Sequence, residues 1–254
     1  MKPTHIAPLF LLLFVAGCSK KKSPGDEHTA KQTTQTKAAM VSSSKPGAVS
    51  LNPKLTTYVK SVLPRMERIP ANRKASLKKL AQFIRTKVKA KEPANLTFIC
   101  THNSRRSHMS QLWAATAAAY YGVDGVKTFS GGTESTAFNP RAVAAMQRAG
   151  FTIENPGGKN PHYKVAFSKD SPAEECFSKE YGDDFNPKNN FAAVMTCSQA
   201  DKSCPLVKGA SLRVGLPYID PKVSDGTGRE AVTYDKRAKQ IAVEMFYLMS
   251  QVKG

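Results

Sequence analysis

The amino-acid sequence predicts an α/β fold for residues 95–254, a three-layer sandwich with a central parallel sheet. From Leu96 onward, short apolar segments of strand character alternate with longer segments of helical periodicity. Strands and helices that alternate at this spacing form a parallel sheet with helices on both faces. Ligands of such sheets bind at the carboxyl ends of the strands. A hydrophobic content of 41% is sufficient for a buried core.

The expected elements follow from the spacing of the apolar residues. Strands are predicted at 96–100, 126–129, 191–197 and 212–216, and helices at 107–121, 140–149 and 229–252. Asn139 is placed to cap the second of these helices. Residues 157–190 break the alternation. The segments Tyr163 to Phe167 and Glu175 to Ser178 flank Lys169-Asp170-Ser171-Pro172, a pattern that indicates an inserted hairpin.

Residues 51–94 are predicted to form a basic helical extension in front of this domain. Apolar residues at three- and four-residue spacing predict an amphipathic helix that ends before Pro93, and a shorter helix is expected around Tyr58 to Met66. Residues 51–95 carry a net charge of +10, twelve Lys and Arg against two Glu. This charge would attract anionic lipid. A solvated basic helix face without a partner is an alternative of at least the same weight.

The N-terminus has the pattern of an export signal. Lys2 precedes an apolar segment, Ile6 to Val15, that is too short to span a bilayer stably. The sequence Val15-Ala16-Gly17-Cys18 resembles the bacterial lipobox, which implies that residues 1–17 are removed and that Cys18 is lipidated. Residues 18–50 are polar and predict a disordered tether. The expected location is a bacterial membrane, facing the periplasm. Ser19, rather than aspartate, follows Cys18, and resemblance to enterobacterial sorting implies the outer membrane. The alternative for Cys18 is an unlipidated cysteine in an apolar helix.

Two further functional classes are disfavoured. The chain has a net charge of +19, but the excess lies mostly before residue 96, and export argues against nucleic-acid binding. None of the five histidines has the spacing of metal ligands, so no metal site and no cofactor are expected.

The candidate chemistry lies in the segment between the first predicted strand and the helix that follows it. Cys100-Thr101-His102-Asn103-Ser104-Arg105-Arg106-Ser107 fits the pattern Cys-x5-Arg-Ser. In a turn of this kind the backbone N–H groups and the start of the helix form an oxyanion-binding P-loop. The same field favours a cysteine thiolate, so Cys100 is the candidate nucleophile. Arg106 can hold two oxygens of the anion with its planar fork.

With this loop, the chain resembles the low-molecular-weight protein tyrosine phosphatase superfamily from Phe98 to about Leu248. The resemblance implies that Ser107 donates to the thiolate and that Asn103 maintains the shape of the loop. Ser130-Gly131-Gly132-Thr133, followed by Asn139-Pro140-Arg141, is similar to the second strand, turn and helix of the family. Asp220-Pro221 stands where the family places its general acid. An ordinary turn aspartate is the alternative for Asp220.

Within the superfamily, Cys197 and Cys204-Pro205 resemble the redox pair of thioredoxin-coupled arsenate reductases. That resemblance implies a Cys100 adduct with arsenate, a disulfide between Cys100 and Cys197, its transfer to Cys204, and a thioredoxin-like reductant as partner. The segment after Asp220-Pro221 has no aromatic residue, whereas the phosphatases usually carry tyrosines there. Arsenate reduction is therefore the leading interpretation.

Several alternatives stay open. The chain could be a phosphatase that hydrolyses phosphomonoesters through a phosphocysteine at Cys100, or a non-catalytic oxyanion-binding lipoprotein. Cys197 and Cys204 could instead form a static disulfide, because an exported protein meets an oxidising compartment. His102 and Arg105 depart from the residues usual in the family, and His102 and His108 are expected to pack or to form hydrogen bonds. Cys176 matches no family cysteine and is either a core thiol or an extra redox partner.

Overall fold

The computed structural model describes residues 49–203 and 206–253. The predicted signal, the lipidation site Cys18 and nearly all of the tether therefore lie outside the described residues, and so does Cys204. Within the described part of the chain, no helix combines the length and the apolar character that crossing a bilayer requires.

The core of the fold is a four-stranded parallel sheet, as predicted. Its strands lie in the order β2 (Val126–Gly132), β1 (Ala94–Cys100), β6 (Phe191–Met195) and β7 (Ala210–Gly215). All three neighbouring pairs are parallel. The carboxyl ends of the strands therefore meet at one edge, which is where the polar loops of the candidate site begin.

Both faces of this sheet are buried. Successive side chains of a strand point to opposite faces, so neighbouring residues of one strand join different cores. Leu96 and Phe98 of β1 belong to a large hydrophobic core, whereas Ile99 belongs to a smaller core with Met195 of β6. The strands consequently read as continuous apolar segments.

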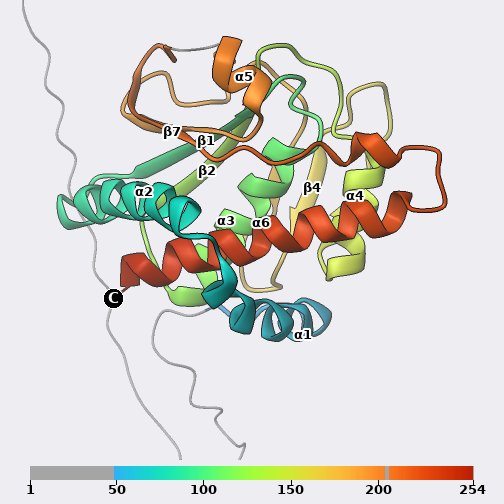
Figure 1. The fold of residues 1–254 in the computed structure, drawn as a ribbon, viewed down its shortest axis with the longest axis horizontal. Helices are drawn as coiled ribbons and strands as arrows, with labels where there is room; N and C mark the ends of the chain where they lie inside the picture. The colour runs from blue at the N-terminus through green and yellow to red at the C-terminus, as the bar shows by residue number, and fades with distance from the viewer. Residues whose placement is uncertain (1–48, 204–205, 254) are drawn as a thin grey trace, which may run out of the picture. The chain divides into compact units, whose positions relative to one another are not determined.

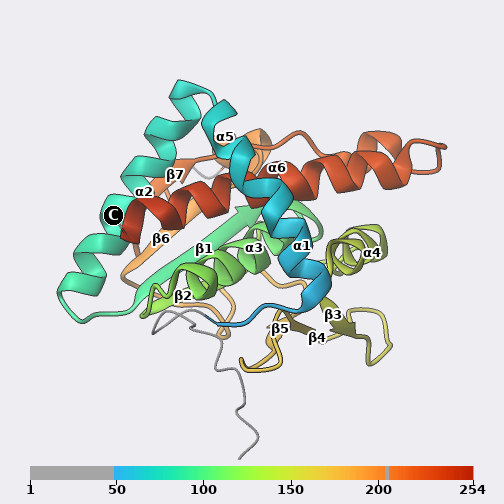
Figure 2. The same ribbon diagram turned by 90° about the horizontal axis from the view of Figure 1, so that it is seen from below.

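Three helices cover the face with the larger core. Helix α3 (Arg106–Tyr121) lies against β1 and β2, and α6 (Glu230–Lys253) packs along α3. Helix α2 (Ala71–Lys89) packs against α6, β7 and β1. Figures 1 and 2 show α6 as the long helix that runs beside both α2 and α3. The fully buried Trp113 of α3 forms ring contacts with Tyr58, Phe151 and Phe246, which lie in three distant segments.

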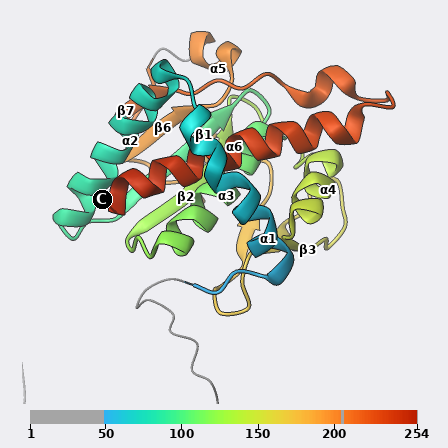
Figure 3. The ribbon, with the colours of Figure 1, turned by 60° about the horizontal axis from the view of Figure 1, so that its bottom comes forward.

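The N-terminal helices are part of this same core. Helix α1 (Pro53–Val62) buries Leu55, Val59 and Val62, and α2 buries Leu77, Leu80, Ala81 and Ile84. The predicted short helix at Tyr58 to Met66 is placed too late. Pro53 begins α1, since proline is favoured in the first turn of a helix, and Pro64 falls at the start of a separate 3₁₀-helix, η1 (Leu63–Arg68). Figure 3 shows α1 close to α4, with which it is in contact.

The middle of the chain also follows the prediction. Helix α4 (Pro140–Ala149) is capped by the Asn139 side chain, which accepts a hydrogen bond from Arg141 N at 3.0 Å. It ends at Gly150, whose φ of 116° and close approach to the backbone of Leu55 leave no room for a side chain. The predicted hairpin is formed by β4 (Tyr163–Ala166) and β5 (Glu174–Cys176), which are antiparallel.

Three short elements were not predicted. Strand β3 (Thr152–Glu154) adds to the hairpin, while α5 (Ser198–Ser203) and the 3₁₀-helix η2 (Pro221–Ser224) follow β6 and β7. None of the three contains an apolar segment that shows a hydrophobic period. The predicted strand at 191–197 correspondingly ends at Met195, which leaves Cys197 at the start of α5.

Candidate active site

The loop between β1 and α3 places Cys100 and Ser107 in contact. Cys100 is buried at the end of β1, and its Sγ lies 3.1 Å from Ser107 Oγ in the first turn of α3. Asn103 Nδ2 donates to the same Ser107 oxygen at 2.9 Å. The Ser107 hydroxyl proton is therefore available to donate to the sulfur, which is the arrangement that stabilises a thiolate.

Asn103 fixes the turn of the loop. Its φ is 42°, in the left-handed region that asparagine tolerates better than most residues. Its side chain is fully buried, and Oδ1 accepts a hydrogen bond from Lys179 N at 2.9 Å. The asparagine thus joins the loop to the segment that follows β5.

The segment after β2 supports the other side of the loop. Thr133 N and Glu134 N donate to the carbonyl oxygens of Cys100 and Thr101, at 3.2 and 3.0 Å. A Cβ on Gly132 would lie 2.2 Å from the Glu134 oxygen and 2.7 Å from Asn103 N, so only glycine permits this approach. This close approach explains why glycine stands at position 132 in the segment Ser130-Gly131-Gly132-Thr133 that resembles the family.

Arg106 is held by the segment after β7. Its Nη2 lies 2.7 Å from Asp220 Oδ2, and its Nη1 donates to the carbonyl oxygen of Tyr218 at 3.1 Å. Asp220 also caps η2 by accepting from Lys222 N at 3.1 Å. An oxyanion held by Arg106 would thus be within reach of the Asp220 carboxyl group, the position that a proton donor needs.

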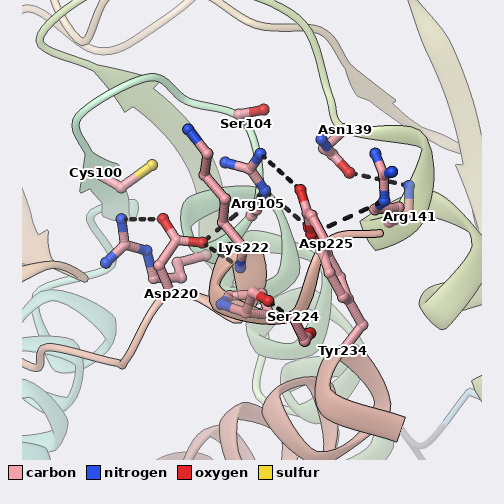
Figure 4. A network of polar contacts seen from close by, with 12 residues as sticks. Cys100, Ser104, Arg105, Asn139, Arg141, Asp220, Lys222, Ser224, Asp225 and Tyr234 are labelled. Atoms are coloured by element: carbon pink, nitrogen blue, oxygen red, sulfur yellow. Dashed lines mark hydrogen bonds and ion pairs between the residues drawn. The ribbon is translucent and has the colours of Figure 1, made fainter. Parts of the chain in front are cut away.

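Arg105, expected as a residue of the oxyanion-binding loop, and His102, for which packing or hydrogen bonding was expected, both have partners outside the loop. Figure 4 shows Arg105 directed toward Asp225 and Tyr234. Its Nε donates to Tyr234 Oη at 3.0 Å, and Nη2 lies 3.7 Å from Asp225. Burial and the hydrogen bond to Asp225 raise the pKa of Tyr234 to about 12, so the phenol stays protonated and donates to Asp225. The exposed His102 lies 3.1 Å from Glu134.

Cys197 lies against the same loop. Its Sγ is 3.5 Å from Thr101 Oγ1, the residue after the candidate nucleophile. The sulfur also accepts a hydrogen bond from Ala200 N at 3.3 Å, at the start of α5, and the side chain is buried in the same small core as Cys100. The structure therefore brings two of the three predicted redox cysteines to one loop. The third, Cys204, lies outside the described residues.

A polar network of Arg73, Glu244 and Tyr218, which contacts Arg106 through the Tyr218 carbonyl oxygen, was not predicted. Arg73 of α2 donates to both carboxylate oxygens of Glu244 in α6, at 2.5 and 2.6 Å, and to the carbonyl oxygen of Pro217 at 3.0 Å. Tyr218 Oη donates to Glu244 at 2.7 Å. Burial and the Glu244 charge raise the pKa of Tyr218, so its hydroxyl keeps the proton. Because the Tyr218 carbonyl oxygen accepts a hydrogen bond from Arg106, the network helps to position the Arg106 side chain.

Only one sequence signal could have indicated this network. Glu244 interrupts the apolar sequence from Ile241 to Met249 in the last helix, and a carboxylate there must be paired if it is buried. Nothing in the sequence identifies Arg73 as its partner, because the two residues are far apart in the chain.

Cys176 and His108 are buried groups outside the loop. Cys176 is fully buried, and burial raises the pKa of its thiol, which favours the core-thiol interpretation over a redox role. His108 stacks on Phe138 with ring centroids 4.2 Å apart, and its Nε2 lies 3.1 Å from the Phe177 carbonyl oxygen. Burial, and then the charge of Lys179, lower the pKa of His108 to about 3.

A cavity of about 320 Å³ adjoins the loop on the Arg105 side. Three basic side chains line it, His102, Arg105 and Lys222, so it favours anions. Within residues 49–203 and 206–253, no three His, Cys, Asp or Glu side chains are grouped as a metal site would require.

Comparisons with known proteins agree with this geometry. The family model of the low molecular weight phosphotyrosine protein phosphatases matches residues 95–161. An arsenate reductase of Bacillus subtilis (strain 168) is 30% identical over 143 residues, which are 56% of this chain and 84% of that protein. Arsenate reductase 2 of Staphylococcus epidermidis (strain RP62A) is 27% identical over 124 residues, 49% of this chain and 76% of that protein.

Solved structures include similar chains. A low molecular weight protein tyrosine phosphatase from Bacillus subtilis aligns with a TM-score of 0.43 and 16% identity. The alignment covers 63% of this chain and 97% of that chain.

Replacing Arg73 tests the network behind Arg106. Arg73→Gln leaves the Glu244 carboxylate buried without its cation, so we expect a loss of about 3–5 kcal/mol in the free energy of unfolding. At temperatures where the variant is folded, displacement of Tyr218 should lower kcat/KM by up to about 10²-fold. Denaturant unfolding and steady-state kinetics measure the two effects.

One matched control is another basic residue of α2, and the other removes the charge of Glu244 together with that of Arg73. Lys78→Gln, at an exposed position of α2, should change neither quantity appreciably. The double variant Arg73→Gln/Glu244→Gln removes the buried charge and should regain stability without regaining full turnover. Wild-type turnover in folded Arg73→Gln would show that the network does not position Arg106.

The lowered pKa of His108 predicts that the free energy of unfolding falls at acidic pH. The unfolded chain binds a proton at this residue near pH 6.5, whereas the native protein does so only near pH 3. Its contribution to stability is thus complete above about pH 6.5 and is lost as the pH falls toward 3, at about 1.4 kcal/mol per pH unit. In His108→Gln, urea unfolding between pH 4 and 6 should show a slope smaller by this amount. The exposed His162, replaced in the same way, is the control, and equal slopes in both variants would contradict the assignment.

Proposed function

Since the chain belongs to the family of low molecular weight phosphotyrosine protein phosphatases and arsenate reductases, we propose that this cysteine-dependent oxyanion enzyme reduces arsenate to arsenite. The observation that carries the proposal is the position of Cys197, whose Sγ lies 3.5 Å from Thr101 Oγ1 in the oxyanion loop. A phosphatase needs no second buried thiol at this place, whereas reduction consumes two thiols. The arsenate reductases among the relatives support the same choice.

The first step uses the loop. Arsenate binds to the loop N–H groups and to the Arg106 guanidinium, with the start of α3 contributing its positive end. The Cys100 thiolate, stabilised by Ser107, attacks the arsenic(V) atom, and a Cys100 Sγ–As bond forms. One arsenate oxygen leaves as water, and Asp220 beside Arg106 supplies a proton to it.

The second step transfers electrons. Cys197 attacks Cys100 Sγ, so an S–S bond forms while the S–As bond breaks and leaves its electron pair on arsenic, which departs as arsenite. Cys204 then attacks Cys197, which releases the Cys100 thiolate and leaves a Cys197–Cys204 disulfide. A dithiol of the thioredoxin kind reduces this disulfide and is itself oxidised.

Phosphomonoester hydrolysis is the second candidate function. The contact between Asp220 and Arg106 favours it, because a general acid beside the anion is what protonation of an alkoxide leaving group requires. The surface after Asp220 argues against an aromatic substrate. Val223 is 76% exposed there and Lys222 lines the adjoining cavity, and among the described residues no Phe, Tyr or Trp lines that cavity to contact a phosphotyrosine ring.

A cysteine substitution separates the two functions. Cys204→Ser should stop multiple-turnover arsenate reduction with thioredoxin while leaving the first turnover at Cys100 intact, because the disulfide can no longer be passed outward. Hydrolysis of p-nitrophenyl phosphate, which water completes, should be unchanged in the same variant. Both reactions are followed by steady-state assays, and a single-turnover measurement of released arsenite isolates the first turnover from the later transfer of the disulfide to Cys204.

The controls define the outcome. Cys100→Ser should abolish both reactions, since a serine hydroxyl does not ionise as a thiol does. Cys176→Ser should retain arsenate reduction because Cys176 lies in the core. If wild type and Cys204→Ser hydrolyse p-nitrophenyl phosphate equally and neither reduces arsenate with any dithiol, the enzyme is a phosphatase.

We further propose that the enzyme is a lipoprotein anchored through Cys18 and facing the periplasm, where a thioredoxin-like reductant must then be present. The support is the lipobox resemblance at Val15-Ala16-Gly17-Cys18 and the polar composition of residues 18–50. Replacing Cys18 with alanine should move the protein out of the outer-membrane fraction on cell fractionation. Full retention of Cys18→Ala in that fraction would contradict lipidation at this residue.

A further inference from the structure

A second cavity, of about 330 Å³, lies between η1, the start of α2 and the middle of α6. It shares no lining residue with the cavity beside the oxyanion loop. Five of its ten lining residues are basic, and they come from all three elements: Arg65, Arg68, Arg73, Lys236 and Lys239. The remaining wall includes the apolar residues Ile69, Pro70 and Val243.

Among the five basic residues that line this cavity, Arg73 is the one that pairs with a carboxylate in the described part of the chain. Glu244 is its single acidic lining residue, but it is 2% exposed and its oxygens already accept from Arg73 and Tyr218. In the part of the chain that the structure describes, no carboxylate forms an ion pair with Arg65, Arg68 or Lys236. The nearby Asp235 is paired with Arg148.

The arrangement differs from a basic helix face of the ordinary solvated kind. Side chains on one helix spread their charges along a convex surface, whereas here three elements direct them around one concavity. Like charges held around a concave, partly apolar wall repel each other and focus a positive potential, which an anion relieves. Guanidinium groups moreover match phosphate oxygens bidentately.

We propose that this cavity, the helical-extension pocket, binds a phosphate-bearing anion. The guanidinium groups of Arg65 and Arg68 contact the phosphate oxygens, and Lys236 contributes a further cation. The apolar residues accommodate an uncharged part of the ligand, such as a glycerol group. The same phosphate chemistry occurs in the headgroup of an anionic lipid and in a soluble phosphate, so the experiment distinguishes these sources.

Amide NMR of the full chain tests the pocket, because it separates the two anion sites by residue. Inorganic phosphate and monomeric short-chain phosphatidylglycerol are titrated separately at constant ionic strength, with sodium chloride as reference. Resonances of residues 65–73 and 236–243 should shift in a saturable manner, apart from those of the loop at 100–107. In Arg65→Gln/Arg68→Gln the dissociation constant at the pocket should rise at least about tenfold, while phosphate binding at the loop and turnover stay unchanged.

The matched control removes the same charge from elsewhere on the extension. Lys78→Gln/Lys79→Gln, at two exposed positions of α2, should leave binding at the pocket within about twofold of wild type. A response to phosphatidylglycerol that exceeds the response to phosphate identifies a lipid headgroup, and the reverse identifies a soluble anion. The proposal is overturned if neither probe shifts the pocket resonances beyond sodium chloride, or if both double variants weaken binding equally.

Discussion

The position of the Arg106 guanidinium is the constraint on which the candidate site depends. Arg106 begins α3, so its backbone is fixed by the loop, but its side chain is oriented by two acceptors after β7, the Tyr218 carbonyl and the Asp220 carboxylate. The oxyanion fork and the candidate proton donor are therefore oriented by one contact. A displacement of the segment after β7 would move both the Arg106 guanidinium and the Asp220 carboxyl group. Cys100 and Ser107 would keep their own contact.

Arg105 gives that segment a second attachment. It comes from the same loop as Arg106, yet its side chain contacts Asp225 and Tyr234, which lie beyond η2. Two adjacent arginines thus hold η2 from its two ends. Arg106 pairs with Asp220 before η2, and Arg105 lies beside Asp225 after it (Figure 4), with its Nε also 3.9 Å from Asp220. Lys222 between them faces the adjoining cavity. The resulting mouth of the site is cationic, which suits a small, strongly charged oxyanion better than an aromatic ester.

The fold was largely predictable because its strands are short apolar segments and its helices have clear periods. The prediction missed β3, α5 and η2, which contain no apolar segment that shows a hydrophobic period, and it misplaced the helix boundaries that proline sets, at Pro53 and Pro64. Within the site, the loop residues followed from their motif. The outward contacts of Arg105 and the link from Arg73 to Glu244 could not, because they join side chains that only the tertiary fold brings together.

Helices α1 and α2 lie outside the segment that the family model matches, but they are part of the folded core. The family model matches from residue 95, but seven apolar residues of these two helices are buried in the same core as β1 and α3, and Arg73 neutralises a carboxylate of the last helix. A fragment that begins at residue 95 would expose one side of that core and leave Glu244 unpaired. The smallest unit that could be transplanted or expressed with its fold intact therefore begins before Pro53, well upstream of what sequence similarity defines as the domain.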